Sequence, residues 1–120
     1  EELLSSGYSF VSYPLRVVIR LYPREEKDFP ARIAVSVSKR RFKRAVKRNR
    51  VKRLIRETYR LNKNILYSYI PEDKTMDILF IYLHDEIFEY GKIEKAITGA
   101  IKKIRSYIEK DSGGDIADTY

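Results

Sequence analysis

One segment of this sequence lies between two strand patterns and has the period of a helix with one apolar and one strongly basic face. At 100° per residue from Arg48, five side chains fall within an arc of about 140°: Val51, Leu54, Ile55, Thr58 and Tyr59. The opposite arc holds Asn49, Arg50, Lys52, Arg53, Arg56, Glu57 and Arg60. The pattern predicts a helix over about residues 48–62, running on toward residue 67, with its apolar face packed on a sheet. Residues 39–47 are predicted to form a basic loop that leads into it.

Three strand patterns surround this helix. Residues 15–22 (LRVVIRLY) and residues 32–38 (RIAVSVS) are joined by a polar loop, which predicts an antiparallel hairpin. Residues 77–83 (DILFIYL) predict a third, largely buried strand. The basic helix is therefore expected to be a crossover connection between strands.

The two ends of the chain complete the predicted fold. Residues 1–6 are expected to be the last turn of a helix that Gly7 closes, and isoleucines and alanines at helical spacing predict a final helix over about residues 89–110. The polar residues 111–120 are expected to be a disordered tail. The chain is thus predicted to be one α/β domain over residues 1–110, an α+β two-layer sandwich with a small mixed sheet.

The predicted strands have two different faces. Leu15, Val17 and Ile19 alternate with Arg16, Val18 and Arg20, and a similar alternation sets Ser36 and Ser38 apart from bulky apolar residues in the second strand. The bulky sets should cover the core. The small and cationic sets should form an open, hydrophilic face, covered by water or by an extended nucleic-acid strand.

Charge is concentrated in the basic segment. Twelve of the 22 residues from Lys39 to Arg60 are Lys or Arg and only Glu57 is acidic, so this segment carries +11 while the rest of the chain carries −3. A solvated helix face usually mixes both signs. Positive charge gathered in one place is better explained by a polyanionic partner.

The sequence offers little for catalysis by the polypeptide alone. It has no cysteine and a single histidine, His84, so neither a nucleophile–base pair nor a transition-metal cluster is evident. The adjacent Asp85 and Glu86 are expected to favour the start of the last helix rather than to hold Mg²⁺. Nothing asks for an oxidising compartment, and no apolar run is long enough for a membrane span, so we expect a cytoplasmic protein with no membrane contact.

Several residues of the basic region allow two interpretations. Asn49 could bond a base edge or 2′-hydroxyl, or accept from the water shell of a phosphate-bound Mg²⁺, but it could equally be a helix N-cap or first-turn residue. Phe10, Tyr13 and Phe42 could stack on bases, although each is more simply explained as core. The open sheet face favours RNA over DNA, because RNA presents single strands to such surfaces.

The run SVSKRRFKRAVKRNRVKRLIRETYR resembles the signature of the protein component of bacterial ribonuclease P, in which a strand ending in SVSK is followed by a short loop and an RNR-containing basic helix. The resemblance implies an unusual left-handed crossover through that helix. It implies a catalytic RNA as partner and the 5′ leader of precursor tRNA as a ligand. The RNA would hold most of the Mg²⁺ and would remove the leader itself, so no catalytic residue is expected in the protein.

The resemblance also implies the site residues. The RNA-binding set comprises Lys39, Arg40, Arg41, Lys43, Arg44, Lys47, Arg48, Asn49, Arg50, Lys52, Arg53, Arg56 and Arg60, with Asn49 as a possible metal ligand shared with RNA. The leader cleft, between the open sheet face and the basic helix, would comprise Leu4, Phe10, Arg16, Val18, Ser36 and Ser38. Leu4 stands where the family usually has a phenylalanine, and the approach RRFKRA is one residue longer and more basic than the family pattern. The protein is expected to be a monomer apart from its RNA.

Two other functions remain open from the residues alone. A ribosomal or general RNA-binding protein of similar α/β fold explains the charge but not the RNR context. A protein-only nuclease lacks an evident set of catalytic groups.

Overall fold

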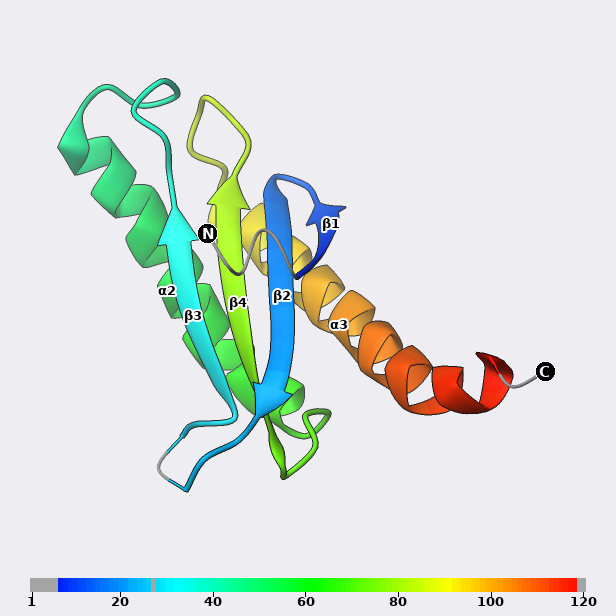
Figure 1. The fold of residues 1–120 in the computed structure, drawn as a ribbon. Helices are drawn as coiled ribbons and strands as arrows, with labels where there is room; N and C mark the ends of the chain where they lie inside the picture. The colour runs from blue at the N-terminus through cyan, green and yellow to red at the C-terminus, as the bar shows by residue number, and fades with distance from the viewer. Residues whose placement is uncertain (1–6, 27, 119–120) are drawn as a thin grey trace.

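The computed structural model describes residues 7–26 and 28–118, with side chains through residue 110. Four strands, β1 (Tyr8–Ser12), β2 (Leu15–Pro23), β3 (Ala31–Ser36) and β4 (Lys74–Tyr82), form one sheet (Figure 1). Two helices, α2 (Ala45–Tyr67) and α3 (Tyr90–Asp118), complete the described part. The result is an α+β fold with a small mixed sheet, as the sequence predicted.

The strand order β1-β2-β4-β3 corrects the predicted hairpin. β2 pairs antiparallel with β1 and β4, whereas β3 pairs only with β4, and in parallel. β4 therefore lies between the two strands that were expected to be neighbours. β4 comes from a distant part of the chain. The short loop between β2 and β3 suggested that these two strands pair with each other, and it gave no sign that β4 lies between them. β1 was also missed, because its five residues lie in the stretch before Pro14 that carries only a weak strand pattern.

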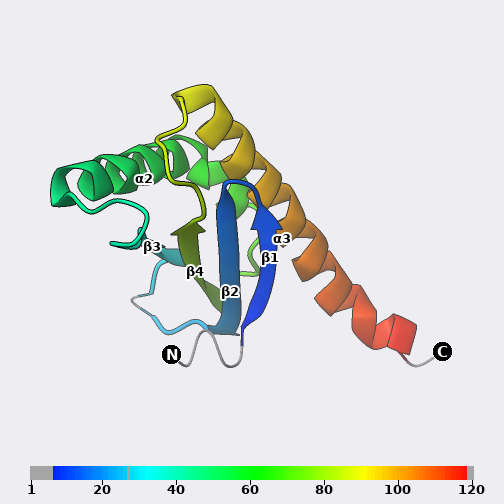
Figure 2. The ribbon, with the colours of Figure 1, turned by 90° about the horizontal axis from the view of Figure 1, so that it is seen from above.

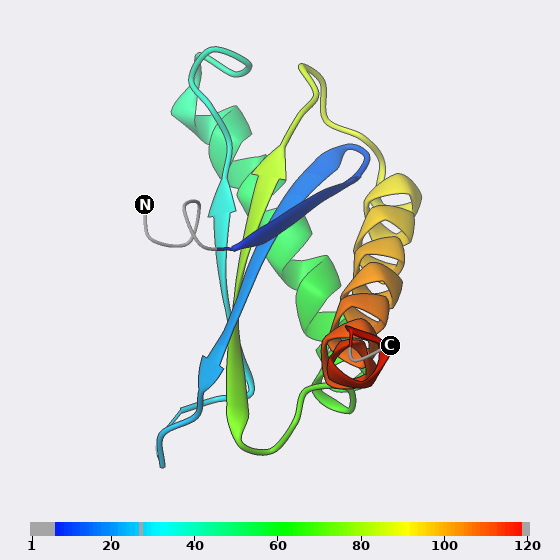
Figure 3. The ribbon, with the colours of Figure 1, turned by 45° about the vertical axis from the view of Figure 1, so that its right-hand side comes forward.

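The two described helices cover the same face of the sheet, and neither lies on the other face (Figure 3). In Figure 1, β3 and β4 both point upward with β3 on the left, and α2 lies behind them. The β3–α2–β4 crossover is therefore left-handed. This confirms the hand that the family resemblance implied, against the strong right-handed default.

The core lies between the sheet and the helices. Leu15, Val17 and Ile19 are fully buried, as predicted from their alternation. Six side chains of α2 face the core. Leu54 is half-buried, and the other five are buried: Val51, Ile55, Thr58, Tyr59 and Leu66. The helix thus docks with its predicted apolar face.

The element boundaries differ modestly from those expected. α2 begins at Ala45, earlier than residue 48, and reaches Tyr67. α3 continues to Asp118, past the expected end near residue 110. The disorder expected of residues 111–120 and the domain limits stay predictions, and the helical turn expected over residues 1–6 lies outside the described residues.

Candidate nucleic-acid interface

The exposed side of α2 carries a continuous set of cations, here called the cationic face: Arg50, Lys52, Arg53, Arg56 and Arg60, with Asn49 and Glu57 among them. All of these side chains are exposed except Lys52, which is half-buried. Their position follows from the helical period, since the opposite side of the helix is held in the core. Within the described part of the chain, only Arg60 of this set has a carboxylate partner, Glu57, to which its Nε donates at 3.0 Å. Most of the charge is therefore available to an external anion.

A depression of about 380 Å³ follows this face, lined by Asn49, Lys52, Arg53, Arg56, Glu57 and Arg60. Asn49 lies inside the helix, five residues after the N-cap residue Arg44, so the alternative that it caps the helix is wrong. Its amide is exposed among cations. That placement suits a hydrogen bond to a ligand already held by its charge.

The loop between β3 and α2 continues the positive surface. Lys39, Arg40, Lys43, Arg44 and Lys47 are exposed there and at the first turn of α2. Two other arginines have internal partners. Arg41 pairs with Asp85 at 3.0 Å, and Arg48 Nη1 donates to the carbonyl oxygens of Phe42 and Lys43 at 2.9 and 3.0 Å.

Arg48 therefore has a structural role that its place in the RNR motif did not predict. Its guanidinium satisfies two backbone carbonyls of the loop that precedes α2. Phe42, on the same loop, is buried and packs near Tyr82 at a ring distance of 6.0 Å. Phe42 is thus a core residue rather than a stacking platform, and it anchors the basic loop to the sheet.

The sheet face that neither described helix covers was predicted to form the leader cleft together with the basic helix. α2 lies on the opposite face of the sheet, so it does not form a wall of that cleft (Figure 3). Arg16 and Ser36 are exposed there and lie in one row, since both pair with Ile81 of β4. Arg16 Nε also donates to Ser9 Oγ on β1 at 3.2 Å. Ser38 is exposed but lies beyond β3, where its Oγ accepts from the Arg41 N–H at 3.3 Å.

Two of the predicted cleft residues expose little side chain on the open face. Phe10 pairs with the core residue Val17, so it faces α3, where the Lys103 ammonium lies 5.6 Å from its ring centre. Val18 is on the open side, in register with Ser9 and Leu79, but it is only 1% exposed. Neither offers much surface to a ligand in the cleft. Leu4 lies outside the described residues.

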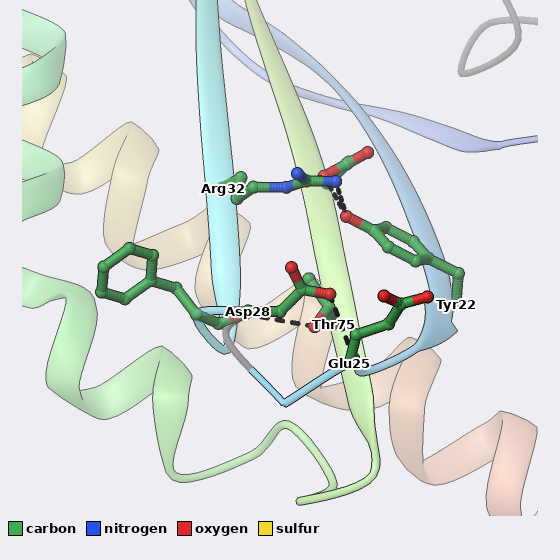
Figure 4. A network of polar contacts seen from close by, with 7 residues as sticks. Tyr22, Glu25, Asp28, Arg32 and Thr75 are labelled. Carbon is green, nitrogen blue, oxygen red and sulfur yellow. Dashed lines mark hydrogen bonds and ion pairs between the residues drawn. The ribbon is translucent and has the colours of Figure 1, made fainter.

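The far end of the open face carries a polar network that the sequence did not reveal (Figure 4). Tyr22 Oη donates to Asp77 Oδ1 at 2.9 Å, and Arg32 reaches across the sheet to both groups, with its Nε 3.1 Å from Asp77 Oδ1. The guanidinium groups of Arg20 and Arg32 lie 5.3 and 5.4 Å from the Tyr22 ring centre. In the loop beside it, the Glu25 N–H donates to Asp28 Oδ2, and Thr75 of β4 donates from its hydroxyl to the carbonyl oxygen of Phe29. The Asp77 carboxylate is thereby neutralised within a cationic surface.

The residues described do not fit a Mg²⁺ ion held by protein alone. They contain no cluster of three acidic, histidine or cysteine side chains. The oxygen of Asn49 has mainly lysine and arginine around it, and Glu57 is already paired with Arg60. A hard cation needs several oxygen ligands, which these residues do not supply. In the same part of the chain, no helix is long and apolar enough to span a membrane.

A two-layer α+β sandwich whose left-handed crossover helix exposes one cationic face is a distinctive class of small protein. Comparison with known proteins identifies it further. The ribonuclease P family model matches residues 1–105. The ribonuclease P protein component of Porphyromonas gingivalis is 43% identical over 103 residues, which cover 85% of this chain and 74% of the relative. That of Clostridium botulinum is 38% identical over 99 residues, or 80% and 81% of the two chains.

Solved structures agree on the fold. The ribonuclease P protein from Thermotoga maritima superposes with a TM-score of 0.64 at 22% identity, over 85% of this chain and 87% of that one. The Staphylococcus aureus protein gives 0.64 at 24% identity, over 86% and 85%. The chain therefore belongs to the ribonuclease P protein family. Membership implies a role in an RNA-processing enzyme of tRNA maturation and a partnership with the ribonuclease P RNA.

Proposed function

We propose that this chain is the protein subunit of ribonuclease P and binds two RNA segments on two surfaces. The cationic face of α2 and the β3–α2 loop hold the catalytic RNA. The open face of the sheet guides the 5′ leader of precursor tRNA. Cleavage of the leader is assigned to the RNA, and the protein raises leader affinity and helps the RNA work at low Mg²⁺.

The observation that carries this proposal is that most cations of the cationic face have no internal counterion in the described part of the chain. Within the described residues, Arg50, Arg53 and Arg56 are exposed and form no ion pair with a carboxylate. Guanidinium groups bind phosphate oxygens in a bidentate manner, and each phosphate contact releases counterions from the nucleic acid. A helix that keeps so much charge unpaired is stabilised by a polyanion on that side.

The open face suits a single strand for two reasons. Arg16 supplies a cation and Ser36 a small hydroxyl in one row across β2, β4 and β3. Toward the far end of the open face, Arg32 and Tyr22 donate hydrogen bonds to the Asp77 carboxylate. The negative charge of Asp77 is thereby compensated and does not repel a phosphate backbone. An extended leader can therefore lie along this face without meeting an uncompensated negative charge from Asp77.

Any Mg²⁺ at this interface is proposed to be held by RNA phosphates. The protein's own contribution near Asn49 is positive charge and a single amide, which position RNA but do not form a coordination shell. When bound by RNA, Mg²⁺ supplies the Lewis acid for phosphodiester hydrolysis.

Replacing both Arg53 and Arg56 by alanine tests the assignment of α2. We expect at least about a tenfold loss of affinity for the cognate RNA and a salt slope lower by roughly 1.4 to 1.8, from two lost phosphate contacts. The matched control changes Lys102 and Lys110, two exposed lysines of α3, and removes the same charge elsewhere. Equal affinities of the two double variants for the RNA would refute the role of α2.

A further inference from the structure

A second hollow lies away from the cationic face, between the β1–β2 turn and the start of α3. Its volume is about 240 Å³, and it is lined by Tyr13, Pro14, Phe88, Lys92 and Lys95. Phe88, Lys92 and Lys95 belong to neither surface proposed above. The lining combines aromatic rings with ammonium groups, which is the combination that binds nucleotides.

The walls of this hollow are fixed by hydrogen bonds from the strands. Tyr82 Oη donates to the carbonyl oxygen of Glu86 at 2.7 Å and accepts from the Phe88 N–H at 3.0 Å. The Leu83 N–H donates to the carbonyl oxygen of Pro14 at 2.8 Å. These bonds hold the β4–α3 loop and the β1–β2 turn together, so the hollow is formed before any ligand arrives.

The aromatic side chains have different amounts of free surface. The His84 ring stacks on Phe88 at 4.2 Å, and the Lys92 ammonium lies 4.9 Å from the centre of the same ring. Tyr13 bonds to His84 Nδ1 through its hydroxyl at 2.9 Å, yet 58% of it is exposed. The ring of Tyr13 is therefore fixed in place and still open to stacking.

The charge at the hollow favours an anion. Among the described residues that line it, two are lysines and none is a carboxylate. Lys92 and Lys95 are one helical turn apart, so they share a side of α3. The nearby Asp85 is engaged by Arg41 of the basic loop.

The hollow and the basic loop also occupy the same end of the sheet. Figures 1 and 2 show the β1–β2 turn, the β4–α3 loop and the β3–α2 loop together at this end. The Arg41–Asp85 ion pair joins two of these loops directly. An RNA bound to the basic loop can therefore extend along this end of the sheet and reach the hollow.

We propose that this hollow binds one unpaired nucleotide of an RNA, with the base stacked on Tyr13 and a phosphate between the ammonium groups of Lys92 and Lys95. The proposal rests on the proposed function in one respect, that the partner is RNA. It adds a contact point separate from both α2 and the open sheet face. The nucleotide belongs either to the catalytic RNA or to precursor tRNA, and the experiment distinguishes these sources.

The direct test is photo-crosslinking with 4-thiouridine in the complex of the full chain, the cognate RNA and precursor tRNA. In one arm the catalytic RNA carries the label, and in the other arm precursor tRNA carries it. Near-ultraviolet crosslinks are mapped by mass spectrometry. We expect a crosslink on the Tyr13 peptide in one arm. Changing Lys92 and Lys95 to Gln should reduce its yield severalfold, whereas the same changes at Lys102 and Lys110 should not.

Affinity supplies a second readout. Tyr13→Leu should weaken binding of the RNA that crosslinks by roughly 5- to 150-fold, the range for loss of one stacked base. Tyr13→Phe keeps the ring and should stay within about twofold of the unchanged protein, although it loses the bond to His84. If a Tyr13 variant does not unfold cooperatively on heating, the affinity of the variant with Lys92 and Lys95 changed to Gln is compared with that of the unchanged protein instead.

The outcomes separate this inference from the proposed function. Crosslinks on α2 without any at the hollow, together with unchanged affinity of Tyr13→Leu, would overturn the inference and leave the role of α2 intact. Crosslinks at the hollow without any on α2 would support the inference and refute the assignment of α2. Absence of RNA crosslinks at both places would overturn both.

Discussion

Arg48 shows how one arginine of a basic motif can stabilise the fold while its neighbours stay exposed. Its guanidinium donates to the backbone carbonyls of Phe42 and Lys43, whereas Arg50, two residues on, is exposed and has no carboxylate partner in the described part of the chain. Sequence alone treats both as the same kind of residue. The structure separates them by the direction in which each side chain leaves the helix.

The change Arg48→Ala should therefore reduce stability as well as RNA affinity. Loss of hydrogen bonds from a charged donor to two carbonyls, partly exposed to water, is expected to cost about 1 to 2 kcal/mol in the free energy of unfolding. Arg50→Ala should change that free energy by less than about 0.5 kcal/mol. Urea unfolding of the two variants without RNA measures the difference, and equal midpoints would contradict the structural role of Arg48.

Tyr59 is a core residue whose side chain is expected to lower the stability of the fold. Its ring is buried at 6% exposure, and its hydroxyl has no hydrogen-bond partner among the described residues. Burial raises the pKa of Tyr59 well above its ordinary value, and the nearby Tyr67 hydroxyl, which does not reach hydrogen-bonding geometry, raises it further. The folded state thus favours the neutral phenol.

Two results are expected from Tyr59→Phe. At neutral pH the variant should be as stable as the original or slightly more stable, because an unsatisfied buried hydroxyl is removed. The stability linked to the raised pKa is complete below about pH 10 and is lost as pH rises above it, since the unfolded tyrosine then ionises while the folded one does not. The free energy of unfolding, measured between pH 8 and pH 11 (roughly the range that spans the ordinary tyrosine pKa), should decrease less steeply with pH for the variant than for the original protein. An identical pH dependence would contradict this account.

At the scale of elements, α2 was the most predictable part of the molecule. Its core residues Val51, Ile55 and Tyr59 and its exposed arginines follow from local period alone. The partners of β3 did not follow, because β4 comes from beyond the helix and lies between β2 and β3. Phe10 was misplaced for a related reason: its side is set by pairing with Val17 in a strand that the local pattern did not reveal.

Some parts of the candidate site could be predicted from the sequence and others could not. Charge and period placed the cationic face correctly, since both are local properties. The network of Tyr22, Arg32 and Asp77 was not foreseen, because it joins three strands whose register the sequence does not show. The hollow at Tyr13 and Phe88 depends likewise on a contact between a turn and a distant loop.

Glu57 gives a prediction about α2 as an element. It is the carboxylate in the depression on the cationic face and it pairs with Arg60. Glu57→Gln should free Arg60, raise affinity for the cognate RNA severalfold and steepen the salt slope by roughly 0.7 to 0.9. Stability should change by less than about 0.5 kcal/mol, because exposed ion pairs contribute little. RNA titrations at several salt concentrations measure this, and weaker binding by the variant would contradict it.

At the scale of the whole molecule, one sheet separates the two surfaces that we propose for RNA. Its covered face packs α2 and α3 and so directs the cationic face outward, while its other face, on which neither described helix lies, has Arg16 and Ser36 in one row. The left-handed crossover brings the basic loop and the first turn of α2 to one end of that sheet. This arrangement is the basis of our proposal that the catalytic RNA and the leader bind on different sides of the protein.

The central claim is that the chain assists an RNA that does the cutting and does so through the 5′ leader. The most direct measurement is cleavage of precursor tRNA by the cognate RNA at low Mg²⁺, with and without the protein, using substrates with a full leader and with a leader of one nucleotide. The account predicts that the protein increases cleavage and substrate affinity strongly for the full leader and only weakly for the short one. Equal gains for both substrates, or cleavage by the protein without RNA, would contradict it.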